Sequence, residues 1–83
     1  MQEIKLTEDE KVILRNLPER FKWIARDNEG SLDVFCAKPF KDEVVWMPTE
    51  IHEWEDISIF CHLFSFVKWE DEEPYLIEDL LKM

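Results

Sequence analysis

The sequence contains a single glycine, Gly30, among 83 residues. Phosphate-binding loops of the P-loop and dinucleotide types need several glycines, so neither type is present. The chain also lacks an apolar run near the ~20 residues that a membrane-spanning helix requires, because Ser65 interrupts the longest run, Leu63 to Val67. The first residues contain no apolar stretch, and we therefore expect no secretory signal.

Cysteine and histidine are scarce as well, with Cys36, His52, Cys61 and His62 making up the whole set. Zinc sites usually have paired ligands two to four residues apart, and no pair here has that spacing. The adjacent Cys61 and His62 would point to opposite faces of a strand, which is no arrangement for a nucleophile and its base. We expect reduced thiols in a cytoplasmic protein, no metal or cofactor, and no enzymatic activity.

Basic residues are almost absent from the second half of the chain. Residues 1–41 carry eight acids and eight bases, which sum to zero. Residues 42–83 carry twelve acids against only Lys68 and Lys82, which accounts for the whole net charge of −10. A half-molecule this acidic repels nucleic acid and anionic membranes and attracts basic protein surfaces. The charge thus points to a protein partner, and to no direct contact with nucleic acid or membrane.

Aromatic residues, by contrast, are abundant: six Phe, four Trp and one Tyr. Such side chains supply a dense core for a short chain. The length allows one domain, so we expect residues 1–83 to form a single acidic domain.

The segment Thr7 to Glu10 predicts the start of a helix. Thr7 can cap the free backbone N–H groups while Glu10, three residues on, reaches back in a capping box. Pro18 disfavours helical backbone in the residue before it, so the helix should run over residues 8–17.

Alternating apolar residues over 21–26 and 32–37 predict two strands. The turn between them contains Gly30, which suits a positive φ, so the two runs predict an antiparallel hairpin. The alternation places Asp33 on the same face as Phe35. The basic side chains of the first strand are expected to pair with the protein's own acids.

The remaining elements are less sharply patterned. Residues 44–47 predict a third strand that ends at Pro48, and residues 51–56 look irregular or form a turn of helix. The segment 57–69 is apolar on both faces, which favours a helical turn near 59–63 and a strand over 64–69.

The last helix is predicted to open at Pro74, because proline suits the first helical position. It should bury the stripe formed by Leu76, Ile77, Leu80 and Leu81. The order of elements indicates an α+β fold, in which N-terminal and C-terminal helices pack on one face of a small antiparallel sheet.

Two sequence blocks resemble a known family. One comprises Lys22 to Asp27 with Gly30 and Lys38-Pro39; the other comprises Leu63 to Tyr75 with Ile77 and Leu80-Leu81. The chain resembles, over roughly residues 8–82, a family of small uncharacterised proteins from phages and prophages of Gram-positive bacteria. The resemblance implies a phage-encoded protein that acts in the bacterial cytoplasm, and it implies no activity.

Two groups of residues are candidates for partner binding. The first consists of Glu50, Glu53, Trp54, Glu55 and Asp56, and the second of Trp69, Glu70, Asp71, Glu72 and Glu73. In one interpretation the four consecutive acids occupy a basic groove that normally holds phosphates. In the other they only precede a helix N-terminus, where acids are favoured. Trp54 and Trp69 are candidate interface anchors or, alternatively, core residues.

These observations lead to two hypotheses about function. The more specific is a protein-binding inhibitor of a host nucleic-acid-handling or defence protein, which acts by charge mimicry. The alternative is a non-catalytic accessory or structural module of the phage that self-associates and uses its acids for solubility.

Overall fold

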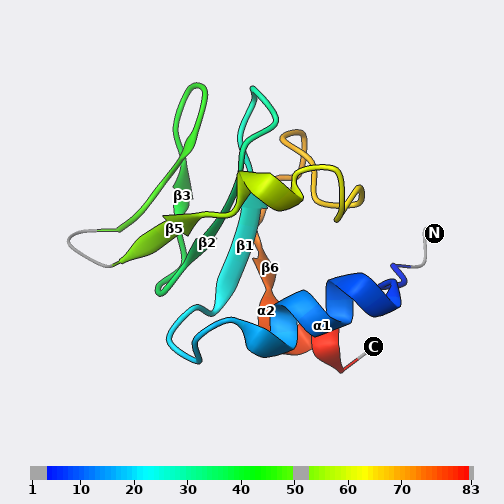
Figure 1. Cartoon of the computed structure of the whole chain (residues 1–83). Helices are drawn as coiled ribbons and strands as arrows, with labels where there is room; N and C mark the ends of the chain where they lie inside the picture. The colour runs from blue at the N-terminus through cyan, green and yellow to red at the C-terminus, as the bar shows by residue number, and fades with distance from the viewer. Residues whose placement is uncertain (1–3, 50–52, 83) are drawn as a thin grey trace.

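The computed structural model describes residues 4–49 and 53–82. Its elements are α1 (Glu8–Asn16), β1 (Trp23–Arg26), β2 (Leu32–Phe35), β3 (Phe40–Lys41), β4 (Trp46–Met47), β5 (Trp54–Asp56), the 3₁₀ helix η1 (Ser58–Phe60), β6 (Tyr75–Leu76) and α2 (Ile77–Leu81) (Figure 1). The α+β fold class is confirmed.

The main sheet has four antiparallel strands in the order β5-β2-β1-β6. The predicted hairpin forms its centre, with Ile24 paired to Val34, and Gly30 in the turn has a φ of 96°. The strands β3 and β4 make a separate two-stranded sheet. The predicted strand over 44–47 is therefore present at Trp46–Met47, but it pairs outside the main sheet.

The helix α1 begins as predicted. The Thr7 hydroxyl accepts a hydrogen bond from the Glu10 N–H at 3.2 Å, and the Glu10 carboxylate accepts one from the Thr7 N–H at 2.9 Å. The helix ends at Asn16 because Leu17, which precedes Pro18, is extended.

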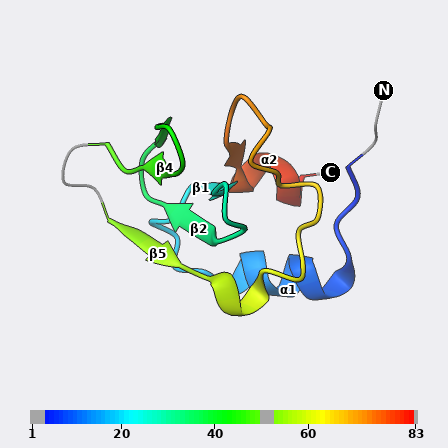
Figure 2. The same cartoon turned by 90° about the horizontal axis from the view of Figure 1, so that it is seen from above.

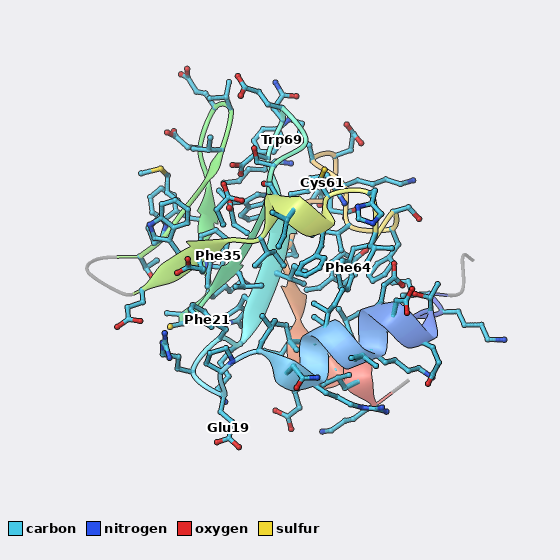
Figure 3. The ribbon with its side chains drawn as sticks, viewed as in Figure 1. Glu19, Phe21, Phe35, Cys61, Phe64 and Trp69 are labelled. Carbon is cyan, nitrogen blue, oxygen red and sulfur yellow. The ribbon has the colours of Figure 1, made fainter. Side chains whose placement is uncertain are left out.

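Each face of the main sheet is covered by a different structure (Figure 2). One face carries Ile24, Leu32 and Val34 and packs with Leu14 of α1 and Leu80 of α2. The other face carries a smaller cluster in which the β3–β4 hairpin covers the sheet; its members are Ala25, Phe35 and Trp46, with Trp23 and Trp69 beside them. Figure 3 shows Phe64 toward α1 and Phe35 on the opposite side of the sheet, close to β5.

Residues 64–69 are not a strand, and that prediction was wrong. The carbonyl groups in this region bond to the Arg26 guanidinium, which donates five hydrogen bonds of 2.7–3.2 Å; the acceptors are the carbonyls of Gly30, Cys61, Leu63, Phe64 and Val67. Arg26 thus pairs with backbone carbonyls and not, as expected, with the protein's acids. An arginine can satisfy five acceptors at once, which holds an irregular segment without a partner strand.

Phe64 itself has a φ of 57°, which is uncommon for a residue other than glycine. Its N–H donates to the Glu10 carboxylate at 2.5 Å, and its ring is fully buried. Residues 57–69 are apolar on both faces in the sequence, but only Ile57, Phe64 and Val67 are buried among them, and Ile59 is 80% exposed.

Two further predictions were wrong. Residues 54–56, expected to be irregular or helical, form β5 and pair with β2, with Trp54 opposite Phe35. The last helix begins at Ile77 rather than at Pro74, because Tyr75 and Leu76 first form β6 along β1.

Candidate functional site

The described part of the first acidic group lies on β5 and, for Glu53, directly before it, at an edge of the main sheet. Glu53, Trp54, Glu55 and Asp56 are all exposed there. Glu50, the remaining member of this group, lies outside the described residues. Because the outer edge of β5 has no neighbouring strand in the main sheet, this group is open to a partner.

The second acidic group, residues 70–73, leads into β6 at the other edge of the sheet. The strand order therefore does not bring the two groups together. These acids also do not form the first turn of the last helix, as one interpretation held, because Glu78 and Asp79 occupy that turn. A helix N-terminus does not explain the second group.

Four of the acids have structural partners. Glu53 pairs with Arg20 at 2.8 Å, and Glu73 pairs with Lys38 at 2.9 Å. Two others accept backbone hydrogen bonds: Asp56 from the Ser58 N–H at 2.7 Å and Asp71 from the Lys68 N–H at 2.9 Å. The hydrogen bonds to Ser58 lower the pKa of Asp56. Local structure accounts for these four side chains.

Three glutamates have no such partner. In residues 4–49 and 53–82, no hydrogen bond or ion pair reaches the side chains of Glu55, Glu70 or Glu72. All three are exposed. They are therefore the candidate residues whose negative charge has no partner in the described part of the fold.

The two candidate tryptophans differ in accessibility. Trp54 is 49% exposed and stacks on Phe35 with ring centroids 6.5 Å apart. Trp69 is half-buried against the smaller cluster, and the Lys41 ammonium lies 4.3 Å from its ring centroid. Lys41 also donates to the backbone carbonyls of Trp69 and Asp71. Trp54 is thus the more accessible anchor.

Sequence reasoning missed a buried acid, Asp33, on the hairpin-covered face. It is 5% exposed and lies directly opposite Asp56 in the sheet. Burial, the charges of Asp27 and Asp56, and a hydrogen bond with the Asp27 carboxyl raise the pKa of Asp33 to about 7. The alternation that places Asp33 on the same face as Phe35 was the available signal, since it sets an acid among apolar residues.

Asp27 connects this acid to the covering hairpin. Its carboxylate accepts a hydrogen bond from the Trp46 N–H at 2.8 Å. A second contact joins the same turn to the hairpin, because the Asn28 N–H donates to the Val44 carbonyl at 3.2 Å. The acidic pair therefore lies where the β1–β2 turn meets the β3–β4 hairpin.

The described cysteines and histidine, Cys36, Cys61 and His62, form no comparable site. Cys61 and His62 are exposed, Cys36 is half-buried, and His52 lies outside the described residues. Across residues 4–49 and 53–82, no group of three or more His, Cys, Asp or Glu side chains is arranged to hold a metal ion. In the same part of the chain, no helix is long and apolar enough to cross a membrane.

Comparisons with known proteins return no match to a family model, to a curated protein or to a solved structure.

Proposed function

We propose that this chain is a small acidic protein that binds a basic surface on another protein. In its most specific form, it is a phage-encoded inhibitor that occupies a nucleic-acid-binding groove of a host protein. The observation that carries the proposal is the set of exposed glutamates without structural partners, Glu55, Glu70 and Glu72, together with the exposed Trp54.

The charge distribution supports this proposal. Exposed like charges repel one another, and a fold that only needed solubility would gain by spacing them apart or pairing them. Grooves that bind phosphates are lined with Lys and Arg, which carboxylates can also engage. A large aromatic side chain beside such charges is typical of an interface anchor, and Trp54 lies between Glu53 and Glu55.

A tagged pull-down from bacterial host lysate, at low and moderate salt, tests the proposal. Wild type is compared with a triple variant, Glu55→Gln, Glu70→Gln and Glu72→Gln, which removes charge from the unpartnered positions. The matched control changes Glu19, Glu29 and Glu43 to Gln, which are exposed, outside both acidic groups and also without an ion pair in the described structure.

The expected result is capture of a nucleic-acid-binding protein by wild type and by the control variant, with loss in the triple variant and weakening as salt rises. Capture that is equal for all three proteins would contradict binding through these glutamates.

A second candidate function, self-association, is favoured by one specific observation. Phe40 and Met47, a cross-strand pair on the β3–β4 hairpin, are 51% and 37% exposed, and Trp54 is 49% exposed. Gel filtration of wild type beside Phe40→Ser separates the candidates: an oligomer that dissociates in the variant supports self-association, and a monomer at high concentration excludes it.

A further inference from the structure

A cavity of about 240 Å³ lies between the β3–β4 hairpin and the hairpin-covered face of the sheet. Its walls are mainly apolar and include Trp54, half-exposed at the rim, and Trp46, which is buried. Met47 and Pro48 also line it. The remaining polar side chains of the lining are carboxylic acids, those of Asp27 and Asp33.

The buried acid at this cavity lacks a neutralising partner. In the described residues no backbone N–H or basic side chain hydrogen-bonds to the Asp33 carboxyl, and the charges that act on it are those of two acids, Asp27 and Asp56. Like charges directly across a sheet are destabilising, and Asp33 faces Asp56 in that way. A buried carboxyl costs stability unless it is paired, so a feature this costly calls for a ligand that offsets it.

The nearby bases are engaged elsewhere. The Lys41 ammonium, on the covering hairpin, bonds to the carbonyls of Trp69 and Asp71. Arg26, at the end of β1, directs its guanidinium to carbonyls on the helix-covered side. Neither of these two bases is among the groups that act on Asp33.

The chemistry of the walls specifies the missing partner. Aromatic rings and a methionine contact an apolar stem and, in the case of Trp, attract a cation through the ring face. Two carboxyl groups that line the same cavity can bind a positive donor group at the end of that stem. A lysine or arginine side chain has both parts.

We propose that this cavity binds a basic side chain of the partner protein, whose stem packs against Trp54 and Met47 while its cationic end is held by Asp27 and Asp33. The proposal rests on the proposed function, because it takes the partner to be a basic protein surface. The cavity would add a specific binding site for one side chain to an interaction that otherwise depends on surface charge alone.

Binding at this cavity should depend on pH in a way that surface charge does not. The titratable groups that act on Asp33 are Asp27, from the β1–β2 turn, and Asp56, from β5; Lys41 is the nearby base of the covering hairpin. With an Asp33 pKa of about 7, a cation displaces the proton that the carboxyl holds at lower pH. The affinity should then rise about thirtyfold between about pH 5.5 and about pH 8.

The test is an NMR titration of the full chain with n-butylammonium and, in parallel, n-butylguanidinium; n-butanol serves as the uncharged control. The indole N–H signals of Trp46 and Trp54 report occupancy of the cavity. Asp33→Asn removes the charge with little change in volume. Trp54→Ala, at a half-exposed position, is a second variant that should retain the fold.

We expect a saturable shift of both indole signals with a cationic probe, absent with n-butanol and weaker at the lower pH. Both shifts should be lost in Asp33→Asn, and the remaining Trp46 shift should be lost in Trp54→Ala. The tighter of the two cations identifies the side chain as lysine or arginine. If no saturable shift is seen up to about 100 mM probe, the binding free energy is too small for a built site. That result would overturn the proposal. Equal shifts with n-butanol, or unchanged binding in Asp33→Asn, would also overturn it.

The two proposals fail separately. If Asp33→Asn still captures the basic protein in the pull-down and the probes do not bind, the cavity proposal fails and the proposed function stands. If wild type captures no basic protein but binds the probes, the proposed function fails.

Discussion

Among the residues that the structure describes, one buried acid lies on each side of the main sheet, and the two acids have opposite surroundings. Glu10, on the helix-covered face, and Asp33, on the hairpin-covered face, are both 5% exposed. The Glu10 carboxylate accepts hydrogen bonds from two backbone N–H groups, those of Thr7 and Phe64. The Asp33 carboxyl accepts no hydrogen bond from a described N–H group, and the charges that act on it are those of two other acids, Asp27 and Asp56. Equal burial therefore has opposite consequences: a satisfied carboxylate holds a fold together, whereas an unsatisfied one is free to bind.

The largest change in the free energy of unfolding is expected from replacing Arg26, on the helix-covered face of the sheet. Arg26→Met should lower the free energy of unfolding by about 3–5 kcal/mol, because it leaves five carbonyls without their donor and releases Phe64 from its left-handed conformation. Urea denaturation measures the change. A loss below about 1 kcal/mol would show that this segment does not depend on Arg26.

The apolar part of the same face is tested by Leu80→Ala. Leu80 is 1% exposed within the larger cluster, so its truncation should cost about 2–5 kcal/mol. The same truncation at the exposed Val12 of α1 serves as the control and should change stability by less than about 0.5 kcal/mol. Equal effects at the two positions would mean that α2 is not docked as described.

Glu10→Gln tests whether the fold needs both acceptor oxygens of the Glu10 carboxylate. A glutamine has one acceptor oxygen where the carboxylate has two, so one of the N–H groups of Thr7 and Phe64 loses its acceptor. The expected loss is about 1–3 kcal/mol in thermal or urea unfolding. An unchanged stability would remove the distinction drawn between the two buried acids.

Asp33→Asn is expected to have the opposite sign. At pH 8 it removes the buried charge that the raised pKa of Asp33 disfavours, and it should stabilise the fold by about 1–4 kcal/mol. That gain corresponds to a Tm higher by about 4–8 °C for each kcal/mol. A destabilised variant at pH 8 would mean that the Asp33 carboxylate is already well compensated.

The same variant should flatten the pH dependence of stability. The pKa of Asp33 is raised in the folded state from 3.8 to about 7, so the folded protein binds this proton more tightly than the unfolded chain. The stability that this group contributes is full below about pH 4 and is lost as the pH rises to about 7. Wild type should lose stability relative to Asp33→Asn across that interval, and parallel curves would contradict the raised pKa.

Local signals in the sequence were sufficient for some elements and not for others. The capping box of Thr7 and Glu10 and the turn at Gly30 act within a few residues, and both are present as predicted. The segment 57–69 depends on Arg26, whose acceptors other than Gly30 lie 35 to 41 residues away, and no local pattern reports that. The short strand β5 likewise depends on pairing with β2.

The candidate site divides in the same way. The acids of β5 and of residues 70–73 are recognisable as charge clusters, although their partners Arg20 and Lys38 are distant in sequence. The placement of Asp27 and Asp33 in one cavity cannot be predicted from the sequence, because it depends on the packing of β4 over the β1–β2 hairpin. Alternation alone indicated the side of the strand on which Asp33 lies.

The most direct test of the account is the titration of the Asp33 carboxyl carbon by NMR in the free protein. The account predicts a midpoint near pH 7, because burial, Asp27 and Asp56 all favour the protonated form. A midpoint near the ordinary value of 3.8 would contradict it, since the carboxylate would then already be compensated and the cavity would have no unmet charge to offer a basic partner.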